Sequence, residues 1–202
     1  MSFRTEDKFY LNTKDKFKIS KFLLDNEAKK IYPDRTVLSL YFDTHQFDMF
    51  SDSEEGIVPR KKIRIRQYNK NIFDLNESNS SLEIKINSVE GKFKISKKIL
   101  SFRDILKKGY FDKDYGLCFP CIYVSYKRSY FLHDKSRITI DSDIRYKEFK
   151  SISKTFSSFD RQVILEIKSN NRDHNNMLND IPLNKVRYSK FCEAIKCTKL
   201  FY

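Results

Sequence analysis

Three basic side chains alternate with isoleucines in one short stretch of the chain. Lys62, Arg64 and Arg66 occupy every second position, with Ile63 and Ile65 between them. Successive side chains of a β-strand point to opposite faces, so this spacing predicts a strand with one cationic and one apolar face. Three cations on one strand face repel each other unless an anion lies among them. Because guanidinium forks match phosphate oxygens and lysine adds a point charge, the row predicts a phosphate-binding surface.

Similar alternation, now with carboxylates, recurs elsewhere in the chain. Glu83 and Lys85 share one face of a second predicted strand, and Glu166 and Lys168 share one face of another. Further charged faces carry Arg4, Glu6 and Lys8, then Arg128, then Arg137, Thr139 and Asp141. Carboxylates oppose anion binding unless a divalent cation bridges them to phosphate, which makes Glu166 the first candidate metal ligand, Glu6 the second and Glu83 the third. Each glutamate can instead pair with the lysine two residues away, and the sequence leaves this alternative open.

The overall charge agrees with an anionic ligand but does not identify it. The chain has 40 Lys and Arg against 27 Asp and Glu, a formal charge of +13 and a pI near 9.5. Such a field concentrates nucleic acid, acidic membranes, nucleotides or polyphosphates. A single-strand binder would combine basic residues with exposed stacking aromatics. Here the aromatics fall mostly on predicted apolar faces, so no nucleic-acid partner is expected.

Other reactive side chains show little of the spacing that catalysis or metal binding needs. Cys118 and Cys121 form one local pair, and Cys192 and Cys197 form another, but no histidine lies close to either. We interpret them as reduced thiols, with a zinc site as the alternative. The three histidines, none with metal or triad spacing, are His45, His133 and His174. The glycines are scattered, so no Gly-rich phosphate loop is predicted.

Eight stretches with period-two alternation are predicted to be the strands that position these side chains. They are Phe3–Leu11, Val37–Phe42, Lys61–Tyr68, Ser81–Asn87, Lys92–Ile99, Ile122–Leu132, Arg137–Ile144 and Val163–Ser169. A helix is expected from Thr13 to about Lys30, with Phe17, Leu23, Leu24 and Ala28 packing, and a short one over Asp104–Lys108. Ser189 is expected to cap a last helix, and Asn69–Ser80 and Lys147–Asp160 are expected to be loops.

Eight strands can close a barrel around a modest lumen. The sequence therefore predicts a mainly β (α+β) fold, a single domain over residues 1–202. In it a closed eight-stranded antiparallel β-barrel turns its charged faces inward, with helices flanking the outside. A β-sandwich with a charged, solvated surface is the alternative. No apolar run approaches the roughly 20 residues that span a bilayer, and the N-terminus resembles no signal peptide, so a cytoplasmic location is expected.

Motifs over nearly the whole chain resemble the vacuolar transporter chaperone (VTC) domain of polyphosphate polymerases, in the triphosphate tunnel metalloenzyme (CYTH-like) superfamily. In the expected order they are Arg4-Thr-Glu6-Asp-Lys8-Phe9, Tyr41-Phe-Asp43-Thr44, Arg60-Lys-Lys62-Ile-Arg64-Ile-Arg66-Gln-Tyr68, Leu82-Glu83-Ile-Lys85, Tyr126-Lys-Arg128, Arg137-Ile-Thr-Ile-Asp141, Leu165-Glu166-Ile-Lys168 and Ser189-Lys190-Phe191. Relatives that hydrolyse inorganic triphosphate or cyclise ATP begin with Glu-x-Glu-x-Lys. Arg4 stands in place of the first glutamate, which favours the polymerase branch. Ile99–Cys121 is shorter than the helical segment expected there, which leaves substrate gating open.

The resemblance implies a metal-dependent phosphotransferase with an eight-stranded tunnel. ATP would give its γ-phosphate to a growing polyphosphate chain, with Mn²⁺ or Mg²⁺ as the metal and inorganic polyphosphate or triphosphate as a further ligand. The implied catalytic residues are Lys8, Arg64, Arg66, Lys85, Arg128 and Lys168. The implied phosphate-binding residues are Arg4, Lys62, Arg137 and Lys190, and the implied metal ligands are Glu166 and Glu6. With water as the acceptor the same site would be a triphosphatase, and a non-catalytic polyphosphate- or nucleic-acid-binding module is a further alternative.

Overall fold

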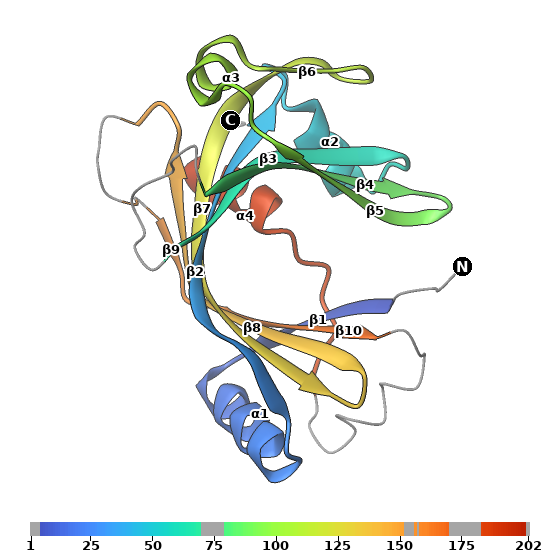
Figure 1. Ribbon diagram of the computed structural model, residues 1–202, viewed down its shortest axis with the longest axis vertical. Helices are drawn as coiled ribbons and strands as arrows, with labels where there is room; N and C mark the ends of the chain where they lie inside the picture. The colour runs from blue at the N-terminus through green and yellow to red at the C-terminus, as the bar shows by residue number, and fades with distance from the viewer. Residues whose placement is uncertain (1–4, 70–78, 152–155, 157, 170–182, 201–202) are drawn as a thin grey trace. The chain divides into compact units, whose positions relative to one another are not determined.

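The structure, a computed structural model, describes residues 5–69, 79–151, 156, 158–169 and 183–200. Within these residues the chain forms ten strands and four helices (Figure 1). In chain order they are β1 (Thr5–Leu11), α1 (Thr13–Asp25), β2 (Lys29–Asp43), α2 (Asp48–Glu55), β3 (Arg60–Asn69), β4 (Ser80–Ser88), β5 (Gly91–Lys98), α3 (Phe102–Lys108), β6 (Tyr110–Asp112), β7 (Gly116–His133), β8 (Ser136–Glu148), β9 (Ser158–Asp160), β10 (Val163–Ser169) and α4 (Lys190–Thr198). Most of the predicted loop Asn69–Ser80 lies outside the described residues, as do Arg4 and His174.

Hydrogen bonds join the strands into one sheet. Its order is β1-β10-β8-β7-β2-β3-β4-β5, while β6 pairs with β7 and β9 pairs with β8. The pairs β1–β10, β10–β8, β2–β3, β3–β4, β4–β5 and β6–β7 are antiparallel. The predicted mainly antiparallel α+β architecture is therefore confirmed.

The predicted closed eight-stranded barrel was wrong, because ten strands form and hydrogen bonding in the described chain leaves β1 and β5 at opposite ends of the sheet order. A later segment occupies the outer edge of β1: the Val186 N–H donates to the Lys8 carbonyl at 2.8 Å, and Phe9 bridges to Lys185. β5 carries four lysines in eight residues. Lysines along an edge strand disfavour pairing with a further strand. The segment beside β1 and the lysines of β5 therefore explain why these two edge strands do not pair with each other.

The chain divides into two compact units. Unit 1 comprises Met1–Arg35, Tyr126–Ile144 and Asp160–Tyr188, and unit 2 comprises Thr36–Ser125, Arg145–Phe159 and Ser189–Tyr202. The long strands β2, β7 and β8 contribute residues to both units. The single domain expected over residues 1–202 stays a prediction.

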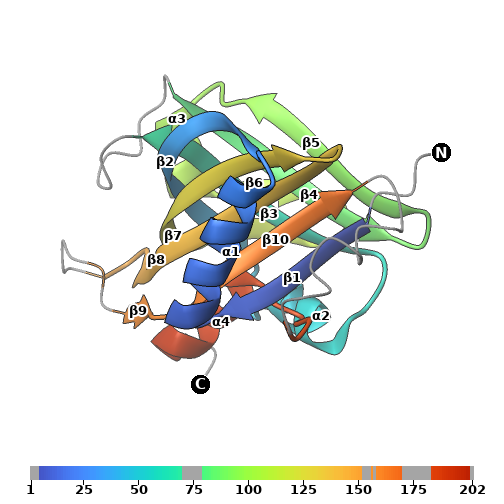
Figure 2. The ribbon, with the colours of Figure 1, turned by 90° about the horizontal axis from the view of Figure 1, so that it is seen from below.

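In unit 1, α1 covers the apolar face of β1, β10 and β8 (Figure 2). A capping box starts the helix, since the Asn12 side chain accepts from the Asp15 N–H at 2.9 Å and Asp15 accepts from the Asn12 N–H at 3.3 Å. The core beneath the helix contains Leu11, Ile19, Leu23, Ile138, Ile140, Leu165 and Ile167. Because strand side chains alternate, the opposite face of these strands carries the charged residues.

In unit 2, the apolar face of β2, β3 and β4 is buried through Leu40, Ile63, Ile65, Leu82 and Ile84. The opposite face carries the basic row of β3, as the alternation predicted. The Phe191 ring of α4 stacks on the Tyr41 ring of β2 at 5.0 Å between centroids. Ser189 caps α4 by accepting from the Cys192 N–H, so the predicted last helix is confirmed.

The Tyr41-Phe-Asp43-Thr44 motif connects β2 to α2, a helix that the sequence did not predict. The buried Asp43 carboxylate accepts from the N–H groups of Thr44, Met49 and Phe50 at 2.8 to 3.0 Å. A carboxylate at a helix N-terminus satisfies amides that have no intrahelical partner. The motif therefore fixes where β2 ends, and with it the position of Tyr41.

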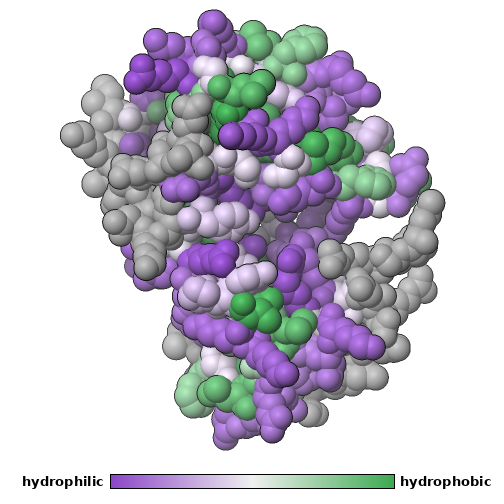
Figure 3. All heavy atoms as spheres, viewed as in Figure 1, coloured by the Kyte–Doolittle hydropathy of each residue, from purple (hydrophilic) through white to green (hydrophobic). Residues whose placement is uncertain are grey.

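The chain is 33% charged, and one face of the molecule reflects this. Hydrophilic side chains cover most of the face drawn in Figure 3, with smaller groups of hydrophobic residues among them. No helix of the described chain is long and apolar enough to cross a membrane.

Candidate functional site

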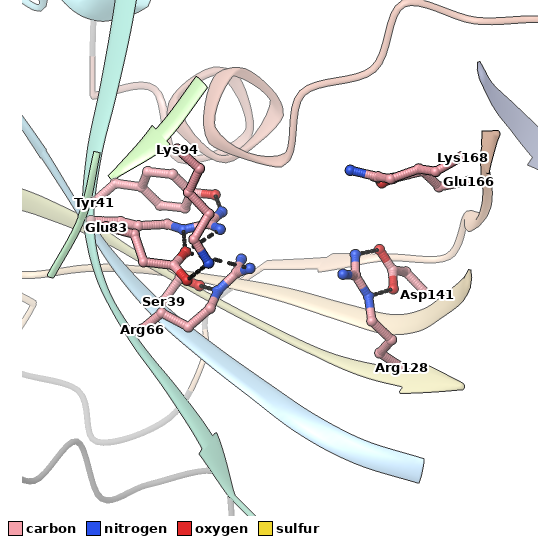
Figure 4. A network of polar contacts seen from close by, with 10 residues as sticks. Ser39, Tyr41, Arg66, Glu83, Lys94, Arg128, Asp141, Glu166 and Lys168 are labelled. Carbon is pink, nitrogen blue, oxygen red and sulfur yellow. Dashed lines mark hydrogen bonds and ion pairs between the residues drawn. The ribbon is translucent and has the colours of Figure 1, made fainter. Parts of the chain in front are cut away.

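Two arginines and a lysine of unit 2 surround the buried carboxylate of Glu83 (Figure 4). Arg64 donates from Nε and Nη2 to Glu83 Oε2 at 2.8 and 2.5 Å, and Lys94 donates to Oε1 at 2.6 Å. Arg66 Nη1 lies 3.8 Å from Oε2. We name these four residues the Glu83 cluster. Three cations around one carboxylate leave an excess of positive charge that can attract an anion.

Two hydroxyl groups of β2 fix the guanidinium groups in place. Arg66 Nε donates to Ser39 Oγ at 3.0 Å, and Arg64 Nη1 donates to the Tyr41 hydroxyl at 3.0 Å. The β2–β3 register explains both contacts, because it places Ser39 opposite Arg66 and Tyr41 opposite Arg64. Both arginines are buried, at 6% and 4% exposure. Their geometry is thus set before any ligand arrives.

The same cations keep the buried carboxylate ionised. Burial alone raises the pKa of Glu83, but the charges of Arg64 and Arg66 outweigh it and hold the pKa at about 2. Burial likewise raises the pKa of Tyr41, and the two arginines again outweigh it, so that pKa is lowered. Glu83 therefore acts as a counter-ion of Arg64, Arg66 and Lys94, whereas the alternative that the sequence left open named a different partner, Lys85.

Three lysines line up across strands beside the Glu83 cluster. Lys62 of β3 lies opposite Lys85 of β4, which lies opposite Lys94 of β5. Lys62 Nζ donates to Ser189 Oγ at 2.8 Å, next to half-buried Lys190 at the start of α4. Like charges directly opposite each other destabilise a sheet unless an anion neutralises them. The row extends the cationic face of unit 2.

On unit 1, two carboxylates share one ammonium group. Lys168 Nζ lies 2.8 Å from Glu166 Oε1 and 3.2 Å from Glu6 Oε2. Lys8 Nζ lies 3.5 Å from Glu6 Oε1 and donates to the Tyr188 carbonyl at 2.9 Å. The β1–β10 register produces this arrangement, pairing Glu6 with Lys168 and Lys8 with Glu166. We name Glu6, Lys8, Glu166 and Lys168 the Glu166 cluster.

A second ion pair of unit 1 lies on β7 and β8. Arg128 donates from Nε and Nη2 to the two oxygens of Asp141 at 2.5 and 2.6 Å, and Asp141 is fully buried (Figure 4). The bidentate fork fixes the guanidinium orientation. Burial raises the pKa of Glu166, but Lys168, Arg128 and Lys8 outweigh it and hold the pKa far below its usual range. Glu166 is therefore a carboxylate at all physiological pH values.

The carboxylates of Glu6 and Glu166 are oxygen ligands of the kind that a divalent cation binds together with phosphate oxygens. Glu6 and Glu166 both reach one point, the ammonium of Lys168. Thr139 lies directly opposite Glu166 on β8, and its buried hydroxyl has no hydrogen-bond partner in the part of the chain that the structure describes. Among those residues no group of three or more His, Cys, Asp or Glu forms a metal cage. Mg²⁺ commonly binds through one or two carboxylates together with substrate phosphates, so this donor set suits it.

The predicted site residues divide between the two units. Lys62, Arg64, Arg66, Lys85 and Lys190 belong to unit 2, while Lys8, Arg128, Arg137, Lys168, Glu6 and Glu166 belong to unit 1. Arg137 lies opposite Lys168 and is exposed. The sequence placed Thr139 on a charged face but gave it no role, and it did not identify Lys94 or Ser39. Only the strand register selects Lys94 from the other lysines of β5, so composition and spacing gave no signal for it.

The cysteines form no disulfide in the described chain. Burial raises the pKa of Cys118 to about 12 and also raises that of Cys121. Thiols with such pKa values stay protonated and unreactive. Cys118 and Cys121 therefore have the properties of ordinary unreactive thiols.

Comparison with known proteins identifies the family. The family model of the VTC domain matches residues 3–114 and 102–199. The chain belongs to the VTC domain family. The match confirms the family that the motifs of this VTC domain indicated.

Solved structures share the fold of this VTC domain at low sequence identity. An adenylate cyclase-like protein from Vibrio parahaemolyticus is 12% identical, with a TM-score of 0.56 over 96% of this chain and 98% of that chain. A chain of the Schizosaccharomyces pombe Mediator head module is 7% identical, with a TM-score of 0.53 over 98% of this chain and 92% of that chain. At such identities the likeness concerns the fold alone. No curated protein matches the chain.

Proposed function

We propose that this VTC domain is a metal-dependent phosphotransferase that moves the γ-phosphate of ATP to a growing polyphosphate chain. The observation that carries the proposal is the Glu83 cluster, in which hydroxyl groups hold two buried arginines beside a lysine row. Fixed guanidinium groups with excess positive charge suit the closely spaced negative charges of a phosphate chain. Membership of the VTC domain family supports the same proposed function.

Phosphoryl transfer asks mainly for positioning and charge neutralisation from a protein. Arg64 and Arg66 would bind phosphate oxygens without reorganising, because Tyr41 and Ser39 already orient them. Lys94, which is half exposed, would move from Glu83 to the arriving phosphate. Arg128, held by Asp141, would contribute a further fixed fork.

Glu6 and Glu166 are the residues that would hold Mn²⁺ or Mg²⁺. When bound, the ion would neutralise phosphate oxygens and offset the charge that develops on them during transfer. The role of the protein is to present these two carboxylates, and the depressed pKa of Glu166 keeps that one ionised.

The decisive experiment incubates the purified protein with ATP and Mn²⁺ and resolves the products by chain length. Growth of polyphosphate with stoichiometric ADP is expected. Release of inorganic phosphate without chain growth would instead establish a triphosphatase. Neither product, with the protein folded and Mn²⁺ present, would contradict a catalytic role and leave polyphosphate binding without turnover.

A further inference from the structure

The ammonium of Lys168 occupies one oxygen of each of the two carboxylates that a divalent cation would need. It lies 2.8 Å from Glu166 Oε1 and 3.2 Å from Glu6 Oε2, so a single cation already bridges carboxylates from two strands. Glu166 and Lys168 extend side by side from β10 in Figure 4. Both lie well inside the protein, with side chains 9% and 18% exposed. Bulk water therefore screens this contact only weakly.

Lys8, the other lysine of the cluster, is engaged differently. Lys8 Nζ donates to the Tyr188 carbonyl at 2.9 Å and lies 3.5 Å from Glu6. Its strand partner is Glu166, but no ion pair between Lys8 and Glu166 is among the described contacts. Arg128 is bound by the fork of Asp141. Lys168 is thus the described cation that touches both candidate metal ligands.

A metal ion and this ammonium group compete for the same two carboxylates. A divalent cation binds carboxylate oxygens at 2.0 to 2.6 Å by general coordination chemistry. An ammonium within hydrogen-bond distance of the same oxygens would then face a second positive centre at close range, and like charges at that distance repel strongly. Lys168 must therefore withdraw from Glu6 and Glu166 before a metal can take both. The withdrawn ammonium needs a new anionic partner, and a phosphate oxygen is one.

We propose that Lys168 is a built-in competitor of the divalent cation, which releases Glu6 and Glu166 only when phosphate accepts its ammonium group. The proposal rests on the proposed function, because it assumes the metal at Glu6 and Glu166. It makes metal and phosphate binding cooperative: phosphate draws Lys168 away, and the freed carboxylates then bind the metal. By linkage, the metal raises phosphate affinity by the same factor.

The test measures Mn²⁺ binding directly. Free Mn²⁺ is counted by electron paramagnetic resonance in titrations with and without inorganic triphosphate, using the protein-free mixture as the reference. The wild type is expected to bind Mn²⁺ about tenfold more tightly with triphosphate present, a typical coupling factor. Lys168→Met keeps the length of the side chain and removes its charge. It is expected to bind Mn²⁺ alone about tenfold more tightly than the wild type, with the coupling reduced to about threefold or less.

Lys8→Met is the matched control, since it removes one positive charge from the same cluster. It is expected to raise Mn²⁺ affinity by less than about threefold. An equal gain from Lys8→Met and Lys168→Met would mean a general charge effect and would overturn the competition. Unchanged or weaker Mn²⁺ binding by Lys168→Met would also overturn it. If Lys168→Met does not fold, Lys168→Gln replaces it.

Two further measurements separate this inference from the proposed function. Calorimetry of triphosphate binding to the wild type tests the anion site, and failure to bind would refute the proposed function itself. If triphosphate binds but Lys168→Met leaves Mn²⁺ affinity unchanged, only the competition by Lys168 is refuted. Glu166→Gln is expected to lose Mn²⁺ binding. Its survival in that variant would place the metal elsewhere and overturn the inference.

Discussion

The orientation of single guanidinium groups decides what the cationic faces can do. Arg64 and Arg66 are buried, and each donates to a hydroxyl of β2 at 3.0 Å. A buried, fixed fork loses little side-chain entropy when it binds an anion, whereas a flexible surface lysine loses more. We therefore expect the arginines to give this face its specificity for phosphate, and the lysines to add electrostatic attraction.

Replacing Arg66 tests that assignment. Arg66→Ala is expected to weaken triphosphate binding by about tenfold to 100-fold, the worth of one charge-assisted hydrogen bond of about 1.5–3 kcal/mol. Arg66→Lys should restore only part of the affinity, because lysine lacks the fork. Calorimetry with inorganic triphosphate measures both. Arg103→Ala, at an exposed position of α3, is the control and should bind normally. Normal binding by Arg66→Ala would remove Arg66 from the phosphate site.

The low pKa of Glu83 predicts a pH dependence of stability. Its folded-state pKa of about 2 lies below the ordinary value of 4.5, so ionised Glu83 stabilises the fold above pH 4.5, and this contribution is lost as the pH falls towards 2. The shift is worth about 3 kcal/mol. Glu83→Gln should therefore be less stable than the wild type at pH 7, with the difference shrinking between pH 4.5 and pH 2. Urea unfolding across this range measures it, and a difference that does not vary with pH would show that Glu83 is not held ionised by Arg64 and Arg66.

At the scale of elements, the sequence identified faces better than edges. Period two is read directly from the chain, so the basic row of β3 and the glutamates of β4 and β10 were placed on charged faces. Edges depend on what covers them: Lys185 and Val186 lie beside β1 although they are far from it in sequence. For the same reason, only the strand register distinguishes Lys94 and Ser39, which no local pattern identifies.

Helix α1 shows where spacing alone misplaces a side chain. The sequence predicted Phe17, Leu23, Leu24 and Ala28 as packing residues, yet Phe17 and Leu24 are 72% and 79% exposed. Ile19 and Leu23, four residues apart, point into the core instead. The last predicted turn does not form, because β2 already begins at Lys29.

Alanine substitutions on α1 should distinguish its buried face from its exposed face by their effect on stability. Leu23→Ala removes a buried side chain from the core under the helix and is expected to cost about 2–5 kcal/mol of unfolding free energy. Leu24→Ala is the matched control, since it makes the same chemical change at an exposed position, and it should cost less than about 0.5 kcal/mol. Equal losses in urea unfolding would mean that α1 does not pack through Ile19 and Leu23.

At the scale of the whole molecule, an excess of positive charge opposes the folded state. The formal charge is +13, and strand pairing brings cations together on single faces, as with Lys62 and Lys85. Folding brings like charges together, and this self-repulsion weakens the native state. A ligand that neutralises those faces should therefore stabilise the protein beyond the effect of ordinary screening.

Thermal melting with inorganic triphosphate tests this expectation. Triphosphate that binds only the folded protein stabilises it by mass action, about 2.7 kcal/mol at 100 times the dissociation constant. Sodium chloride and sulfate at matched ionic strength should raise the melting temperature less, because they screen charge without filling a fixed array of forks. The triphosphate shift should shrink in Arg66→Ala and persist in Arg103→Ala. A rise with sulfate as large as that with triphosphate would mean that the cationic faces respond to ionic strength alone, and the phosphate-chain site would be wrong.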